Sequence, residues 1–174
     1  MDVVIRPREN ADLPQLAAVL VLVHAKDGYP VEGVADPQSW LTPPRQVAAW
    51  TALHADRPIG QISLTSATEN DDAAILWHRA TGGDISQLVI PVRLFVDPAH
   101  RGVGAGALLM LAAHNYASSH KLAMAFDVML KDQAAIQLYE AAGSRRIGVI
   151  EHHHSDGKTE PAAVYVAPAE PITA

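Results

Sequence analysis

A short glycine-rich segment at residues 101–106, with the sequence Arg-Gly-Val-Gly-Ala-Gly, constrains this chain more than any other feature. It follows an apolar run at residues 88–96 and opens a stretch of small and apolar residues at 105–120. That order indicates a strand, a glycine loop and a helix. Glycine lets the backbone approach a ligand closely, and the first turn of a helix offers unpaired N–H groups at the positive end of its dipole. The segment therefore predicts a binding site for a phosphate or diphosphate group.

Spacing distinguishes among the known phosphate-binding loops. The Walker loop requires a lysine directly after its last glycine, and no lysine follows these glycines. The dinucleotide fingerprint G-x-G-x-x-G/A fits Gly102, Gly104 and Ala107, with Asp127 further on as a ribose acceptor. That fold needs several more strand and helix units after the acidic residue, and the remaining chain is too short for them. A dinucleotide-binding oxidoreductase is thus the weaker alternative.

A third pattern, R-x-x-G-x-G, matches Arg101, Gly104 and Gly106. Residues 132–144 read D-Q-A-A-I-Q-L-Y-E-A-A-G-S, which is close to the pattern N-x-x-A-x-x-L-Y-E-x-x-G-F. With these two motifs in this order, the chain resembles the GNAT superfamily of N-acetyltransferases. Asp132 and Ser144 stand where that pattern has Asn and Phe.

The resemblance implies the fold of the acyl-CoA N-acyltransferases, which is of the α/β class with mixed α+β character. We expect a mostly antiparallel central sheet of six to seven strands, splayed between strands four and five and flanked by about four helices. We also expect a single N-acetyltransferase domain over residues 1–174, with a loose tail at about 168–174. Hydrophobic periodicity independently predicts strands at residues 3–6, 46–54, 59–65, 88–96, 122–128, 147–151 and 162–167.

In the superfamily, the glycine loop binds the diphosphate of acetyl-coenzyme A, and the strand before it binds the pantetheine arm through its main chain. The resemblance therefore implies acetyl-CoA as the acyl donor, held by the residues of the strand end, the loop and the second motif. These residues are Leu94, Phe95, Val96, Arg101, Gly102, Val103, Gly104, Ala105, Gly106, Asp132 and Tyr139.

The same resemblance implies transfer of the acetyl group to a primary amine. Tyr139 matches the tyrosine that serves many members as general acid, and Asp127 is the candidate general base. The alternatives are a Tyr139 packed on the sheet with its hydroxyl bonded elsewhere, and a water chain in place of Asp127. The chain has no cysteine, so direct transfer in a ternary complex is the simpler route. A non-catalytic acyl-CoA-binding module is the competing function.

The acceptor amine, a small molecule or a protein amino group, has three candidate contacts in Tyr29, Trp40 and His78. The two aromatic residues follow the first predicted helix, a region that borders the acceptor site in similar acetyltransferases. The alternative is that both cover the core beneath a loop and that His78 is solvated.

Composition excludes several partners. A formal net charge of −6 argues against nucleic acid. No apolar run has the length of a membrane-spanning helix and the N-terminus lacks a signal-peptide pattern, so we expect a cytoplasmic protein without membrane contact. We expect no metal site, because the adjacent histidines at 152–154 alternate between the faces of a strand. Similar proteins are often dimers, which makes a homodimer an option.

Two local features complete the expectations. Asp12 is placed to cap a helix that begins at residue 13. Helical spacing predicts that the helix at 105–120 turns one face inward and exposes His114 and His120. The residues of the predicted inward face are Leu108, Leu111, Ala112 and Tyr116.

Overall fold

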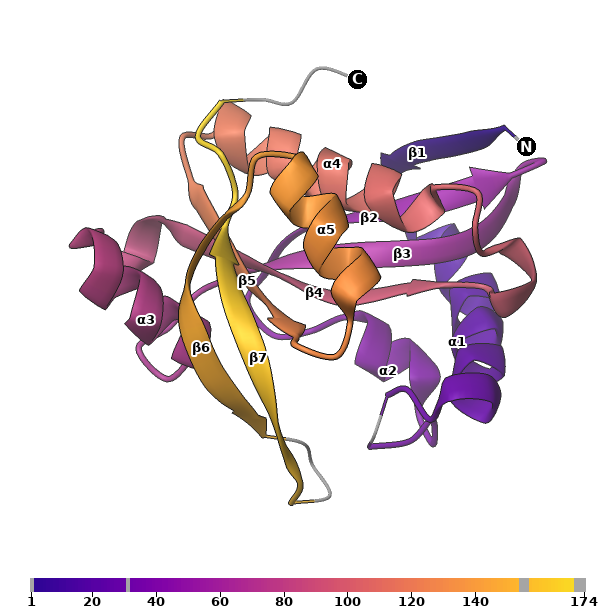
Figure 1. Cartoon of the computed structure of the whole chain (residues 1–174). Coiled ribbons are helices and arrows are strands. Elements are labelled where there is room, and N and C mark those ends of the chain that lie inside the picture. The colour runs from indigo at the N-terminus through magenta and orange to yellow at the C-terminus, as the bar shows by residue number, and fades with distance from the viewer. Residues whose placement is uncertain (1, 31, 154–156, 171–174) are drawn as a thin grey trace. The chain divides into compact units, whose positions relative to one another are not determined.

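The computed structural model describes residues 2–30, 32–153 and 157–170. Its contacts divide the chain into two compact units, one of residues 1–65 and 91–113 and the other of residues 66–90 and 114–174. Strand β4 (Leu88–Val96) and helix α4 (Ala105–Ser119) each contribute residues to both units. The strands in the described residues are β1 (Val3–Pro7), β2 (Gln46–His54), β3 (Arg57–Ser66), β4, β5 (Ala123–Met129), β6 (Arg145–His153) and β7 (Thr159–Val166). They follow the order β1-β2-β3-β4 in the first unit and β4-β5-β7-β6 in the second, and most neighbours are antiparallel (Figure 1). The predicted mixed α/β class is confirmed, with five α-helices in the described residues.

The first unit contains an antiparallel sheet and two helices. The strands β1 (Val3–Pro7), β2 (Gln46–His54) and β3 (Arg57–Ser66) pair in sequence order. The turn between β2 and β3 consists of Ala55 and Asp56, whose positive φ angles of 46° and 61° suit a tight hairpin. The short helix α2 (Pro37–Leu41) begins after Asp36, whose side chain accepts a hydrogen bond from the Ser39 amide at 3.1 Å.

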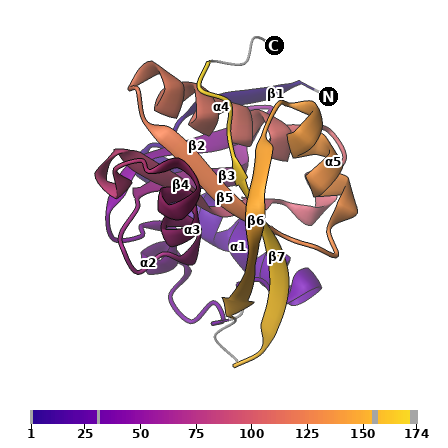
Figure 2. The ribbon, with the colours of Figure 1, turned by 60° about the vertical axis from the view of Figure 1, so that its left-hand side comes forward.

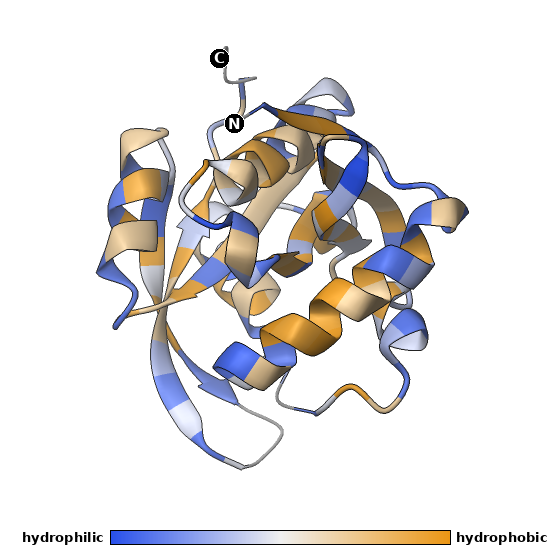
Figure 3. Ribbon diagram, turned by 90° about the vertical axis from the view of Figure 1, so that its right-hand side faces the viewer, coloured by the Kyte–Doolittle hydropathy of each residue, from blue (hydrophilic) through white to orange (hydrophobic). Residues whose placement is uncertain are grey.

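Helix α1 (Leu13–Asp27) supplies much of the core of the first unit. Its fully buried side chains recur every three or four residues, as helical packing requires. They are Leu16, Val19, Leu20 and Val23. Figure 3 shows this helix facing the viewer, orange over most of its length, because Val21 and Leu22 on the outer side are also apolar and are 42% and 55% exposed.

The second unit contains α3 (Asp72–Thr81), β5 (Ala123–Met129), α5 (Gln133–Ala141), β6 (Arg145–His153) and β7 (Thr159–Val166). Figure 2 shows β5, β7 and β6 side by side, with α3 next to them. Strand β5 pairs in parallel with the start of β4 only at Leu88–Ala123 and Val89–Met124, and then in antiparallel with β7. An antiparallel hairpin after α5 is incompatible with the parallel units of a dinucleotide fold, so that alternative is wrong.

Helix α4 presents a different face to the core than its spacing predicts. The buried residues are Ala105, Leu109, Met110, Ala113, His114 and Ala117. The predicted inward residues are all only half-buried. His114 is 3% exposed, and its Nε2 atom lies 2.9 Å from the carbonyl oxygen of Glu170. The prediction that His114 faces solvent was therefore wrong, whereas His120 is exposed as expected.

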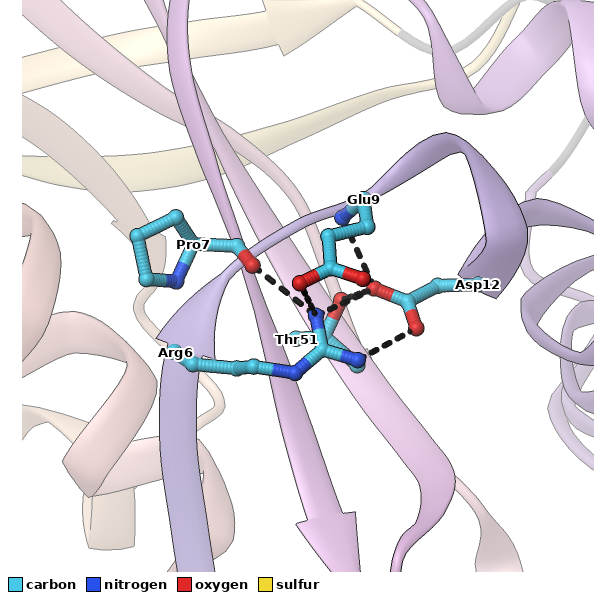
Figure 4. Close-up of polar contacts among 5 residues, drawn as sticks. All are labelled: Arg6, Pro7, Glu9, Asp12 and Thr51. Carbon is cyan, nitrogen blue, oxygen red and sulfur yellow. Dashed lines mark hydrogen bonds and ion pairs between the residues drawn. The ribbon is translucent and has the colours of Figure 1, made fainter.

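Asp12 stands at the N-cap position of α1 but does not cap that helix with its side chain. Figure 4 shows its carboxylate facing the Arg6 guanidinium, with hydrogen bonds of 2.7 and 2.8 Å. It also accepts hydrogen bonds from the Glu9 amide at 2.8 Å and the Thr51 hydroxyl at 2.9 Å. The buried carboxylate thus ties β1, β2 and the start of α1 together, which corrects the capping prediction.

Removing this carboxylate should weaken the fold. Burial alone raises the pKa of Asp12, but the hydrogen bonds from Arg6, Glu9 and Thr51 and the charge of Arg6 outweigh it and hold the pKa below its ordinary value. Asp12→Ala is expected to lower the free energy of unfolding by about 3 kcal/mol, because Arg6 and Thr51 lose their partner. Urea denaturation followed by circular dichroism measures this.

The pH dependence of the same variant gives a second test. A carboxylate with a depressed folded-state pKa stabilises the fold above its unfolded-state pKa of about 3.9, and this contribution is lost as the pH falls through the folded-state value. The loss of stability on acidification should therefore be shallower in Asp12→Ala. Asp56→Asn, at an exposed turn position, is the control. Equal stability of both variants at neutral pH would contradict the assignment.

None of the helices in the described ranges combines the length and hydrophobicity needed to cross a bilayer. Within the same ranges, no three His, Asp or Glu side chains are grouped so that they can hold a metal ion. His154, the last of the three consecutive histidines, lies outside the described residues.

Candidate functional site

The glycine loop lies in the first unit, between β4 and the start of α4. Gly102 and Gly104 have φ angles of 78° and 82°, in the left-handed region that favours glycine. A Cβ atom at either position would meet no atom within 4 Å, so the space beside the loop is open. Among the described residues, the amide N–H groups of residues 102–106 have no acceptor. A row of free N–H groups at a helix start is a favourable environment for an anion.

Arg101 at the start of the loop is held by an acidic residue. Its guanidinium forms an ion pair with Asp27, the last residue of α1, and its Nε donates to the Val96 carbonyl oxygen at 3.4 Å. The hydrogen bond from Arg101 and its positive charge keep the pKa of Asp27 below its ordinary value. The pair anchors the loop to α1 and leaves binding of an anion to the main-chain amides.

The end of β4 approaches β3 closely at Gly60. A Cβ atom on Gly60 would lie 2.5 Å from the Phe95 carbonyl oxygen and 3.1 Å from the Val96 Cα, so only glycine fits there. The Asp97 amide donates to the Ile59 carbonyl oxygen at 2.7 Å. The φ angle of Arg93 is 56°, which interrupts the regular strand just before Leu94. The side chain of Phe95 is buried, so this residue has only its main chain available to a ligand, whereas Leu94 and Val96 are half-buried.

Tyr29 and Trp40 form an aromatic cluster with Phe95. The Tyr29 and Trp40 ring centroids are 5.5 Å apart with the rings edge to face, and those of Trp40 and Phe95 are 6.3 Å apart. Both residues are partly buried and pack against the core around α1. Burial is the main cause that raises the pKa of the Tyr29 hydroxyl, so the hydroxyl stays neutral. The structure brings these two predicted acceptor residues together and gives them a packing role.

Tyr139 lies on α5 in the second unit, half-buried. Its ring packs edge to face on Phe126 of β5, with centroids 4.8 Å apart. The hydroxyl has no hydrogen-bond partner within the described part of the chain. Burial, and to a lesser degree the carboxylate of Asp132, raise the pKa of Tyr139. The group is therefore a protonated phenol, which is the form that a general acid requires.

Asp127 lies on β5 next to Phe126, and its carboxylate has a partner that the sequence did not predict. His152 on β6 places its Nδ1 atom 2.8 Å from the Asp127 Oδ2 atom. Asp132 is exposed at the N-cap position of α5, and its side chain forms no capping hydrogen bond. Phe126 and Asp127 are consecutive in β5, so their side chains point to opposite faces of the sheet. The structure therefore places Tyr139, packed on Phe126, and Asp127, bonded to His152, on different faces and does not bring them together.

His78, the third predicted acceptor residue, is exposed near the end of α3. Its Nδ1 atom lies 2.7 Å from the Gly83 carbonyl oxygen. It borders a shallow cavity of about 470 Å³ together with Glu69, Gly82, Gly83, Asp84 and Ile85. The contact between His78 and the Gly83 carbonyl oxygen gives this histidine a structural role in the turn after α3.

The sequence analysis missed three polar residues of the first unit. Arg8, Gln61 and Arg93 form a hydrogen-bonded network beneath α2. The sequence did give a reason to select Arg93 as a candidate, because it is the one charged residue within the apolar run at 88–96. Gln61 gave a weaker indication, as the one amide side chain in the predicted strand at 59–65.

Known proteins resemble this chain in sequence and in fold. The profile of the acetyltransferase (GNAT) family matches residues 18–143. A search of curated proteins found no match. Solved structures with similar folds include an N-acetyltransferase from Staphylococcus aureus, at 13% identity over 98% of this chain and 100% of that chain, with a TM-score of 0.71.

Two further similar structures were determined with acetyl-CoA. Arabidopsis thaliana NAA60 is 18% identical over 95% of this chain and 97% of its own, with a TM-score of 0.68. The acetyltransferase yncA from Salmonella typhimurium, described as putative, is 14% identical over 100% of this chain and 98% of its own, with a TM-score of 0.71. These similarities show the fold. The profile match spans most of the chain and includes the glycine loop at 101–106 and all but the last residue of the second motif at 132–144. The chain belongs to the acetyltransferase (GNAT) family.

Proposed function

We propose that this chain is an acetyl-CoA-dependent N-acetyltransferase that moves an acetyl group directly to a primary amine in a ternary complex. The observation that carries the proposal is the row of acceptor-free amides at residues 102–106, in the glycine loop to which the resemblance assigns the coenzyme diphosphate. Arabidopsis NAA60 and Salmonella yncA were each determined with acetyl-CoA, which supports the same donor here.

The chemistry makes three demands. The amine must be neutral to attack the thioester carbonyl, the carbonyl oxygen must be stabilised as it becomes negative, and the departing thiolate needs a proton. We assign the proton donor to Tyr139, because its pKa is raised and its hydroxyl is unengaged within the described residues. We assign the acceptance of the amine proton to Asp127, with His152 hydrogen-bonded to the same carboxylate.

We assign the stabilisation of the thioester carbonyl oxygen to main-chain groups. The amides near Leu94, Phe95 and Val96 are the candidates for binding pantetheine and for polarising the thioester carbonyl, since Phe95 buries its side chain and Gly60 holds β3 close behind it. The chain contains no cysteine to form an acyl-enzyme, which favours direct transfer. Binding both reactants side by side then supplies much of the rate.

A binding measurement combined with a turnover assay tests this proposal. Calorimetry is expected to detect acetyl-CoA and coenzyme A, and no binding of NADH. Release of free thiol from acetyl-CoA is expected to rise above background when an acceptor from a panel of primary amines is added. Binding without thiol release for every amine would favour the non-catalytic module, and absence of coenzyme binding would overturn the proposal.

A further inference from the structure

Two arginines from distant parts of the first unit meet at the last turn of α2. Arg8, just after β1, donates from Nη1 to the Leu41 carbonyl oxygen at 2.6 Å. Arg93 in β4 donates from Nη1 to the carbonyl oxygen of Trp40, the preceding residue. The two guanidinium groups therefore bind consecutive carbonyls of one helix end and lie close to each other.

Both arginines are held in fixed orientations. Gln61, fully buried on β3, accepts from Arg8 Nη1 at 2.5 Å and donates from Nε2 to the Arg93 carbonyl oxygen at 3.0 Å. Gln46 accepts from Arg8 Nη2 at 3.1 Å. The Arg93 guanidinium lies over the Trp40 ring, 4.9 Å from its centroid. The left-handed backbone of Arg93, with φ of 56°, belongs to the same arrangement. A pre-oriented guanidinium loses little conformational freedom when it binds a ligand.

The positive charges of this pair are not neutralised by ion pairs. Within the described residues, no carboxylate lies within the 4.0 Å of an ion pair from Arg8 or Arg93. Asp12 acts on Arg8 only at longer range, because its carboxylate is bonded to Arg6. Glu32 acts on Arg93 at longer range and accepts a hydrogen bond from Trp40 Nε1 at 3.2 Å. The contacts of the pair are thus carbonyl and amide oxygens.

Burial makes this arrangement unfavourable for the protein alone. It lowers the pKa of each guanidinium, and the charge of Arg93 lowers the pKa of Arg8 further. Two half-buried like charges without a counter-ion are costly, and an added anion would relieve that cost. A site of this kind favours a ligand with an oxyanion, because the planar guanidinium matches a carboxylate with two parallel hydrogen bonds.

The location connects this pair to the proposed reaction. Arg93 immediately precedes residues 94–96, the strand end proposed to bind the donor, and the Trp40 ring beneath its guanidinium contacts Phe95. We propose that Arg93, supported by Arg8, binds a carboxylate of the acceptor, so that the acceptor is an amino acid or a similar amine carrying a carboxylate. This inference rests on the proposed function and narrows it. Polyamines and aminoglycosides, which are polycations, are disfavoured by the same charges.

Paired acceptors test the proposal directly. Thiol release is measured with the common amino acids, with the matching carboxamides, and with spermidine and kanamycin. The best amino acid is expected to exceed its carboxamide by about 30-fold in kcat/KM, as expected for a lost hydrogen-bonded charge contact. Arg93→Gln should remove that preference by raising KM for the amino acid, while the carboxamide is little affected. Arg93→Lys keeps the positive charge but loses the planar guanidinium, so its preference for the amino acid should lie between those of wild type and Arg93→Gln.

Arg57→Gln is the matched control, because it removes an exposed arginine of the same unit and should leave the preference intact. Thermal unfolding and acetyl-CoA affinity of each variant show that the fold and the donor site persist. Three results would overturn the proposal. They are equal kcat/KM values for the amino acid and its carboxamide, a higher kcat/KM for the polyamine than for both, and an Arg93→Gln variant that loses kcat/KM equally for both acceptors.

A binding experiment separates this proposal from the proposed function. Calorimetry measures N-acetyl amino acids and their carboxamides against wild-type and Arg93→Gln protein, with and without coenzyme A. Carboxylate binding that depends on Arg93 in a protein that fails to bind acetyl-CoA would overturn the proposed function and support the anion site. Absence of carboxylate-specific binding under both conditions would overturn the anion site alone.

Discussion

Replacing Gly104 by valine is expected to weaken acetyl-CoA binding by about 10²- to 10³-fold. The position needs a φ of 82°, and a side chain there would enter the open space beside the row of free amides. A β-branched residue disfavours that backbone conformation, so the amides turn away from the diphosphate and the side chain blocks its approach. Loss of two charge-assisted hydrogen bonds, each contributing about 1.5–3 kcal/mol, accounts for this size of effect. Calorimetric titration with acetyl-CoA measures it.

Gly82→Val supplies the comparison for this variant. Gly82 has a φ of 70° and equally open space around its Cβ position, but it ends α3, away from both motifs in the sequence. The two variants should therefore show similar losses of thermal stability and different losses of coenzyme affinity. Unchanged affinity in a folded Gly104→Val protein would remove the loop from the donor site.

Tyr139→Phe is expected to lower kcat by about 10²- to 10⁴-fold, the range typical of a lost general acid, with little change in acetyl-CoA affinity. The phenyl ring can keep the edge-to-face contact with Phe126, so the fold should tolerate the change. Stopped-flow or steady-state thiol release at saturating acceptor gives kcat, and calorimetry gives the affinity.

The pH profile of kcat adds a qualitative criterion for Tyr139. Because burial raises the pKa of this hydroxyl, the phenol stays protonated beyond the ordinary tyrosine value of about 10. The wild-type rate should therefore not fall through deprotonation of Tyr139 until the pH exceeds that value. Tyr116→Phe, a tyrosine of α4 stacked on His120, is the control that should leave kcat unchanged. Full activity of the Tyr139→Phe protein would show that Tyr139 is not the general acid.

Local features of the sequence were sufficient for much of the fold. The bounds of β4 and the hairpin of β2 and β3 follow from apolar runs bounded by turn residues. The spacing of Gly102 and Gly104 indicates an anion loop, because left-handed backbone is a local property of glycine. Such features depend only on residues a few positions apart, so they can be predicted from the sequence alone.

The buried face of α4 shows where periodicity is insufficient. This helix is rich in alanine and in apolar residues on all sides, so several faces fit the helical period almost equally well. Only the packing of the helix decides that His114 is buried while Leu108 and Leu111 are half-buried. Similarly, Asp12 has the composition and position of a helix cap, yet the nearby Arg6 and Thr51 offer stronger partners.

The sequence by itself determined the family, the positions of the seven strands along the chain, and the loop proposed for the donor, since each rests on short motifs and local periodicity. Tertiary structure alone decided which charged groups meet: Arg8 with Arg93 at the end of α2, and Asp127 with His152 across the second unit. These pairs join residues that are far apart along the chain. Their meeting depends on strand order and register, which bring such residues within hydrogen-bond distance only after the chain has folded.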